Sequence, residues 1–182
     1  MKFQFHVNLN DKHYLDYNIF WIMRSHYGKK MMVGFRVIIA IIFCVSMFKV
    51  LYDGGFSPVS FISIVPMVVV LGVLELLISP LFVLYFKVYF KSLKKKGKMG
   101  YSPSSVVEFY EDKIVETTPD NRSEYKYSGV ERISLVDNKA IYIHLNNIMA
   151  YILPLSCFEN VEQYNTFLEF ITTKCVNFDK YN

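Results

Sequence analysis

The fold of this chain is decided by the stretch Met31-Met-Val-Gly-Phe-Arg-Val-Ile-Ile-Ala-Ile-Ile-Phe-Cys-Val-Ser-Met-Phe-Lys-Val-Leu-Tyr52 and by a second apolar stretch from Phe61 to Phe86. Each stretch has about the 20 residues that an α-helix needs to cross roughly 30 Å of hydrocarbon. A spanning helix satisfies its own backbone hydrogen bonds, which lipid cannot do. Only Asp53–Ser60 separates the two stretches, so we predict a transmembrane hairpin.

The remaining residues form a short flank before the hairpin and a longer one after it. The second flank is long enough for one small domain with its own core, whereas the first must dock on something. Residues 87–98 contain six lysines and no acid, while residues 101–182 contain seven Lys or Arg against twelve Asp or Glu, a net charge of −5. A nucleic-acid-binding domain normally carries the positive charge itself, so this distribution argues against nucleic acid as a partner.

The basic residues near the two spans predict the orientation of the hairpin. They lie before the first span and after the second: Arg24, Lys29, Lys30, Lys87, Lys91, Lys94, Lys95, Lys96 and Lys98. By the positive-inside rule we expect both termini on the cytoplasmic side of a cell (inner) membrane and the link on its outer side. The lysines after the second span also suit anionic lipids, and this role is compatible with fixing the topology. Three cysteines without a pairing pattern fit a reducing compartment.

The apolar stretches contain three charged residues, of which Lys49 lies at the outer end of the first span and can snorkel to the headgroups. Arg36 lies near the cytoplasmic end of the first span, where its long stem can carry the charge back to the headgroups. Glu75 lies about 16 Å from Phe86, at 1.5 Å per residue, and a buried acid often marks a functional site. Protonation, Arg36, or a basic group of a partner could neutralise it. Pro66 and Pro80 are expected to kink the second helix.

The flanks show two different periodicities. Apolar residues alternate over 3–9, which predicts a strand that adds to an edge of the C-terminal domain, and Asn10 or Asp11 can cap an aromatic helix after it. That helix packs either on the domain or in the lipid interface. Six short strands are predicted at 106–110, 113–118, 124–127, 130–136, 140–145 and 148–153, with turns at 137–138 and 146–147. Ser156 and Glu159 resemble a capping box for a helix that buries Phe158, Val161, Tyr164, Phe167 or Leu168, and Ile171.

Strands followed by one amphipathic helix are similar to a pleckstrin-homology-like (PH-like) barrel, and the whole chain resembles the bacterial YcxB-like family. The matching residues are Phe109-Tyr-Glu-Asp-Lys-Ile114, Tyr127-Ser-Gly-Val130, Ala140-Ile-Tyr-Ile143, Ala150-Tyr-Ile-Leu-Pro154 and Phe158. The resemblance implies an α+β membrane protein of the bacterial cell membrane, with a two-helix transmembrane hairpin and a cytoplasmic PH-like antiparallel β-barrel capped by a C-terminal helix. It supplies no catalytic residues.

These features divide the chain into six segments: a strand and helix at 1–30, the first span at 31–52, a loop at 53–60, the second span at 61–90, a basic linker at 91–100, and the C-terminal domain at 101–182. None of them contains a phosphate loop, a nucleophile motif or His and Cys at metal-ligand spacing, so we expect no enzyme activity, cofactor or metal. His144 and Cys157 are interpreted as structural residues.

Three functions are compatible with this organisation. The domain could bind a protein partner, such as another membrane protein or a second copy, through an apolar groove between the last strand and the terminal helix. Alternatively, the chain could be a sensor that engages anionic lipid through Lys87–Lys98, or an immunity protein that meets a membrane-targeting toxin at Glu75. Fold-level analogy does not choose among them.

Overall fold

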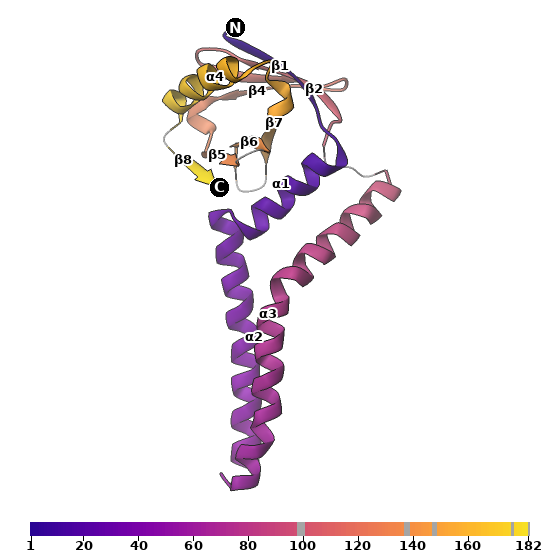
Figure 1. Cartoon of the computed structure of the whole chain (residues 1–182), viewed down its shortest axis with the longest axis vertical. Helices are drawn as coiled ribbons and strands as arrows, with labels where there is room; N and C mark the ends of the chain where they lie inside the picture. Colours follow the sequence, from indigo (N-terminus) through magenta and orange to yellow (C-terminus); the bar gives the residue numbers. More distant parts are fainter. Residues whose placement is uncertain (98–100, 137–138, 147–148, 176, 182) are drawn as a thin grey trace. The chain divides into compact units, whose positions relative to one another are not determined.

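The computed structural model describes residues 1–97, 101–136, 139–146, 149–175 and 177–181. The chain is of the α+β class and forms two compact units (Figure 1). One unit comprises residues 1–17 and 97–182, and the other comprises residues 18–96. Helix α1 (Asp11–Met23) begins in the first unit and ends in the second. The Asn10 side chain caps it, because Oδ1 accepts a hydrogen bond from the His13 amide at 3.0 Å.

Two long helices form most of the second unit. They are α2 (His26–Asp53) and α3 (Pro58–Lys95), and they run side by side over much of their length (Figure 1). Ser25 and Ser57 cap their N-termini through side-chain oxygens that accept from the amides of Gly28 and Ser60. Both helices extend beyond the predicted spans, because a capping serine and not the edge of the apolar stretch sets where each begins.

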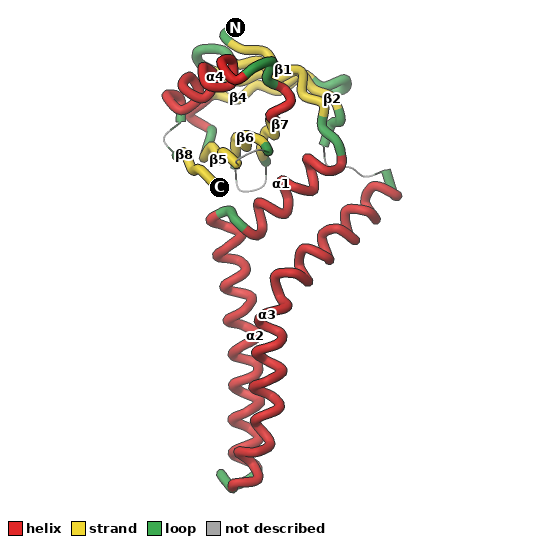
Figure 2. Tube along the Cα trace, in the orientation of Figure 1, coloured by secondary structure: helices red, strands yellow, loops and turns green. Residues whose placement is uncertain are grey.

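The two ends of the hairpin are built differently. At the link, Gly55 and Phe56 both adopt positive φ, 65° and 55°, which reverses the chain within a few residues. At the other end a Cβ on Gly28 would lie 2.0 Å from the Trp21 carbonyl oxygen, so only glycine allows this close approach. Helix α3 bends away from α2 in its C-terminal part (Figure 2), and Pro80, which removes a backbone donor there, accounts for the bend.

The first unit contains two four-stranded sheets (Figure 2). One sheet is antiparallel, in the order β1-β2-β3-β4: Phe3–Asn8, Ser104–Phe109, Lys113–Thr117 and Arg122–Lys126. The other is mixed, in the order β7-β6-β5-β8: Ala150–Pro154, Ala140–His144, Arg132–Val136 and Phe178–Tyr181. Short 3₁₀ turns, η1 (Tyr127–Gly129) and η2 (Leu155–Cys157), follow β4 and β7. The predicted N-terminal strand is confirmed, and it does extend a sheet edge by pairing antiparallel with β2.

The C-terminal helix α4 (Val161–Lys174) completes a core that is rich in aromatic rings. Its residues Phe167 and Ile171 are fully buried among side chains from both sheets. The predicted capping box is wrong, because Asn160 caps α4 by accepting from the Gln163 amide while Ser156 belongs to η2. Val161 is also not a core residue: it is 73% exposed, since the helix begins later than the capping box would place it.

The described strands form two separate sheets and not the single closed barrel that we predicted. The reason is β8, a strand that the sequence analysis missed. It pairs parallel with β5 from Ile133 to Val136, and so occupies the edge that β5 would otherwise offer to β4. The turn predicted at 137–138 and Asn147 of the second turn lie outside the described residues.

Candidate functional site

A polar cluster between α2 and α3 joins the two charged residues that the sequence analysis selected. Arg36 Nε lies 3.7 Å from Glu75 Oε2, and Arg36 Nη2 donates a hydrogen bond to Ser79 Oγ at 3.0 Å. Glu75 and Ser79 are one turn apart on α3, so they share a helix face. Of the routes open to Glu75 for neutralising its charge, the structure thus supplies the pairing with Arg36.

This cluster is only partly satisfied within the chain. Arg36 Nε and Glu75 Oε1 are buried and, among the described residues, lack a hydrogen-bond partner. The two side chains nevertheless remain 42% and 30% exposed. An ion pair in this setting contributes less than a fully hydrogen-bonded pair, but leaving one member alone in an apolar surrounding is costly.

We expect Arg36→Leu to destabilise the hairpin by about 1–2 kcal/mol, because it strands the Glu75 carboxylate; partial exposure keeps the cost below that of a dry core. The double variant Arg36→Leu/Glu75→Leu should recover most of this loss. The measurement is unfolding of the helix pair in mixed detergent micelles, followed by circular dichroism. Lys49→Leu, near the hairpin link, serves as the control. Equal stability of the single and double variants would contradict an energetic coupling of Arg36 and Glu75.

The predicted lysines lie at the ends of the two helices that are distant from the link. Lys29 and Lys30 lie in the first turns of α2, Lys87, Lys91, Lys94 and Lys95 lie on α3, and Lys96 caps it; all are exposed, while Lys98 lies outside the described residues. Spacings of three and four residues place the lysines of α3 on one helix face. Aromatic residues fill the opposite face, where the Tyr85 and Tyr89 rings stack at 6.0 Å. The last turns of α3 are therefore amphipathic, as in helices that meet a headgroup layer.

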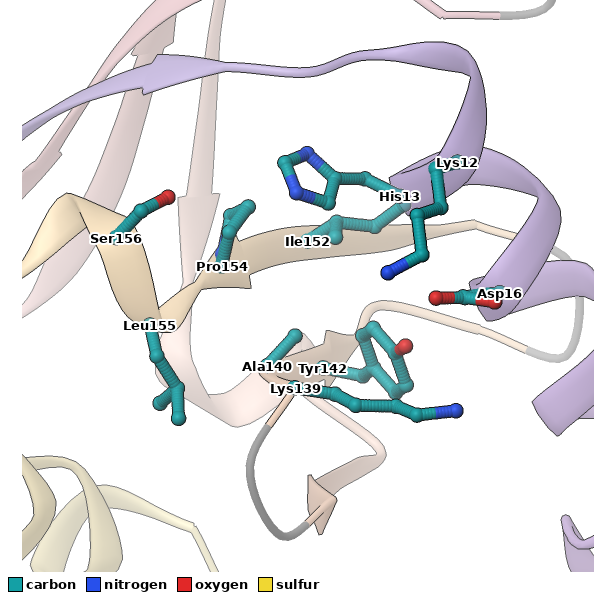
Figure 3. A pocket seen from close by; sticks show the side chains of 10 residues that line it. All are labelled: Lys12, His13, Asp16, Lys139, Ala140, Tyr142, Ile152, Pro154, Leu155 and Ser156. Atoms are coloured by element: carbon teal, nitrogen blue, oxygen red, sulfur yellow. The ribbon is translucent and has the colours of Figure 1, made fainter.

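A cavity of about 220 Å³ lies between α1 and the face of β6 and β7 (Figure 3). Its apolar surface comes from Ala140, Ile152, Pro154 and Leu155. The polar groups around it belong to Lys12, His13, Asp16, Lys139, Tyr142 and Ser156. The sequence analysis selected none of these as site residues, because they come from three distant segments and each is unremarkable alone.

The first half of α1 holds this cavity in place by packing on the domain. Tyr17 is buried and its ring lies 5.1 Å from the Tyr142 ring, edge to face. Tyr14 stacks on Tyr101 at 4.7 Å, and the Tyr101 hydroxyl donates to Asp11 at 3.1 Å. For these residues the structure answers the question that the sequence left open: they pack on protein.

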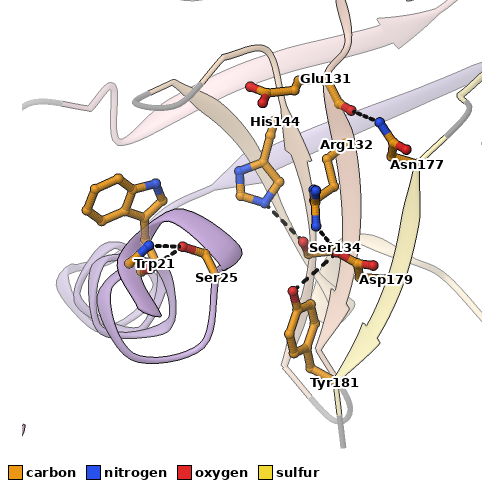
Figure 4. Close-up of polar contacts among 10 residues, drawn as sticks. Trp21, Ser25, Glu131, Arg132, Ser134, His144, Asn177, Asp179 and Tyr181 are labelled. Carbon is orange, nitrogen blue, oxygen red and sulfur yellow. Dashed lines mark hydrogen bonds and ion pairs between the residues drawn. The ribbon is translucent and has the colours of Figure 1, made fainter. Parts of the chain in front are cut away.

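His144 and Cys157 take structural roles, as interpreted from the sequence. His144 is buried and its Nε2 is 3.1 Å from Ser134 Oγ, beside the ion pair of Arg132 with Asp179 that ties β8 to β5 (Figure 4). Burial, assisted by Arg132, lowers the pKa of His144 to about 4. Burial raises the pKa of the Cys157 thiol, which disfavours the reactive thiolate.

A metal-binding cluster is not found in the described part of the chain. Among its residues, no group of three or more His, Cys, Asp or Glu side chains could hold a metal ion. Among the acids of the β2–β3 hairpin, Glu111 forms surface ion pairs, since it lies 3.0 Å from both Lys2 and Lys174. Such exposed pairs contribute little to stability and carry no chemistry.

Comparison with known proteins adds one finding. Residues 109–171, about a third of the chain, match the family described as YcxB-like protein. No curated protein and no solved structure matches the chain significantly. The matched segment runs from the end of β2 into α4 and contains the residues on which the sequence resemblance rested. The match therefore confirms the resemblance to the YcxB-like family over residues 109–171.

Proposed function

We propose that this chain is a membrane-anchored binding protein: α2 and α3 cross the bacterial cell membrane, and a PH-like domain, with no catalysis of its own, binds a protein partner in the cytoplasm. The observation that carries the proposal is the surface of the two helices. Their most apolar windows have mean hydropathies of 2.4 and 2.7, yet only 6% of each window is buried inside the chain. Side chains such as Val69 and Leu76, 59% and 79% exposed, need an apolar surrounding.

Length and charge support the same arrangement. The 28 residues of α2 reach about 42 Å at 1.5 Å per residue, which exceeds the roughly 30 Å of hydrocarbon. Apart from Lys49, the exposed lysines of α2 and α3 lie at the ends of these helices away from the link. By the positive-inside rule this distribution supports cytoplasmic positions for both termini.

The domain supports a binding role more than a chemical one. Two sheets packed with one amphipathic C-terminal helix are the elements of a PH-like fold, although here β8 keeps them from closing into a barrel. The described residues offer a cavity, whereas the hydroxyl of Ser134 and the imidazole of His144, which lie 3.1 Å apart, are both buried and so out of reach of a substrate. Because fold analogy alone names no ligand, the class of partner rests on experiment.

Topology is tested by single cysteine substitutions in whole cells. Val59→Cys, 72% exposed beside the link, should react with a membrane-impermeant maleimide in intact cells. Lys126→Cys, exposed at the end of β4, should react only after lysis, and the parent chain controls for its own three cysteines. Equal labelling of both positions in intact cells would refute the topology.

The binding role is tested by mild-detergent purification of the tagged chain from its host's membranes, read by mass spectrometry. A membrane protein recovered in stoichiometric amount supports the partner proposal. Recovery of the chain alone, with anionic lipid retained, refutes it and supports the alternative. We consider immunity through Glu75 less favoured, because its carboxylate is already held by Arg36.

The alternative function is engagement of anionic lipid by the lysine face of α3. We expect Lys94→Glu/Lys95→Glu/Lys96→Glu to reduce retention of anionic lipid about tenfold at 0.1 M salt, because each lysine near a surface contributes up to about 1 kcal/mol and salt screens it. Native mass spectrometry of the detergent-extracted chain measures the retained lipid. The difference should shrink at 1 M salt, and equal retention by parent and variant at low salt would exclude this role.

A further inference from the structure

The cavity between α1 and the β6–β7 face is lined by more basic than acidic residues, although the domain around it is acidic. Residues 1–17 contain two lysines and two aspartates and residues 101–182 have a net charge of −5, yet two lysines and one aspartate line this cavity. Figure 3 shows Lys12 and Lys139 extending from opposite walls toward the end that holds Tyr142 and Asp16. A concave site with convergent polar groups is the usual form of a ligand site.

These two ammonium groups differ from those lysines of the domain that form ion pairs; Lys126 and Lys180 also have no ion-pair partner among the described residues, but they do not line the cavity. Lys113 and Lys174 each have a carboxylate partner, Glu124 at 2.7 Å and Glu111 at 3.0 Å. Within the part of the chain that the structure describes, no carboxylate lies within ion-pair distance of Lys12 or Lys139. Both lysines are exposed, so they remain available to an anion that enters from solvent.

The remaining groups restrict the ligand. The volume of about 220 Å³ is smaller than the roughly 300–1,000 Å³ of sites for drug-sized molecules, so the site suits a small ion or a headgroup. Ile152 and Pro154 provide an apolar floor for its carbon part. Asp16 repels a bare anion, and therefore selects one with a hydroxyl or amine donor beside its charge.

We propose that this cavity binds a small phosphate ester, with Lys12 and Lys139 on the phosphate oxygens and Asp16 accepting from a donor group of the ligand. The proposal rests on the proposed function, since it names the ligand class of the same binding domain. Lysine is a common phosphate ligand because its ammonium is a compact charge with three donors. A soluble metabolite and the headgroup of an anionic lipid share this chemistry.

The test is calorimetric titration of the full chain in a zwitterionic detergent at fixed ionic strength. Glycerol 3-phosphate, which carries hydroxyl donors, is the soluble probe, and sodium chloride is the reference. We expect saturable binding that Lys12→Gln/Lys139→Gln weakens about 30-fold or more, because two charge-assisted hydrogen bonds are lost. The matched control Lys126→Gln/Lys180→Gln removes the same charge elsewhere on the domain and should change the Kd less than twofold.

A third variant gives the site a signature that general charge effects do not produce. Asp16→Asn should tighten binding of inorganic phosphate about threefold, because it removes the repulsion of an anion that has few donors. The same variant should leave glycerol 3-phosphate unchanged or weaken it, because Asp16 then loses its role as acceptor. Parallel changes for the two probes would overturn the role of Asp16.

A second arm identifies the source of the phosphate. Short-chain phosphatidic acid added to the detergent replaces the soluble probe, with Lys94→Gln/Lys95→Gln as a control for the α3 lysines. Binding of this lipid alone, lost in Lys12→Gln/Lys139→Gln, assigns the site to a headgroup and supports the proposal. The proposal is overturned if neither probe binds. It is also overturned if the lipid binds with equal affinity to Lys12→Gln/Lys139→Gln and to Lys94→Gln/Lys95→Gln. The maleimide labelling of Val59→Cys reports separately whether the membrane topology holds.

Discussion

Phe5→Ala is expected to lower the free energy of unfolding of the C-terminal domain by about 3–5 kcal/mol, the usual cost of deleting a buried aromatic ring. Phe5 is 1% exposed, and its ring centroid lies 4.9 Å from those of Phe158 and Phe167 and 5.8 Å from that of Phe109. Denaturant unfolding of the full chain in detergent, followed by near-ultraviolet circular dichroism of the domain, measures the loss.

The neighbouring residue provides the control. His6 is exposed on the opposite face of β1, so His6→Ala should change the free energy by less than about 0.5 kcal/mol. A result in which both variants unfold alike would mean that β1 is not a strand of the core. The domain would then have to fold from residues 101–182 alone.

Strand β1 shows which features of the fold the local sequence predicts and which it does not. The alternation of Phe3, Phe5 and Val7 was enough to predict a strand and, since a single strand needs a sheet, its addition to the C-terminal domain. The partner strand and its register, in which Phe5 lies opposite Val107, could not be predicted. The two strands are separated in the sequence by both long helices, and no local pattern specifies which strands pair. The last strand was missed for a related reason: β8 has only four residues, none of them buried, and it is held by pairing with β5 and by the partly exposed ion pair of Asp179 with Arg132.

For the candidate sites, too, the sequence indicated individual residues but not which residues meet in the folded chain. Arg36 and Glu75 stood out because charged residues are rare in apolar spans, but their meeting depends on the register of α2 against α3. The cavity could not be predicted, because Lys12 and Lys139 are ordinary surface residues until α1 packs against β6. Periodicity thus predicted most elements, whereas the sites depend on how those elements are paired.

Acidification should destabilise the domain through His144 in particular. Its pKa is about 4 in the folded protein because of burial and Arg132, against about 6.5 when unfolded, so the unfolded chain binds the proton first. Stability is therefore unaffected above about pH 6.5 and falls as the pH decreases toward 4. By pH 5 the loss due to this group is about 2 kcal/mol, and it reaches about 3 kcal/mol below pH 4.

Unfolding measured between pH 7 and pH 5 in wild type and in His144→Asn tests this expectation. Asparagine can still pair with Ser134 but does not titrate, so the variant should lose most of the pH dependence in this range. His6→Gln, at an exposed position, should retain it. An unchanged pH dependence of the unfolding free energy in His144→Asn would mean that the folded protein binds a proton at His144 as readily as the unfolded chain does.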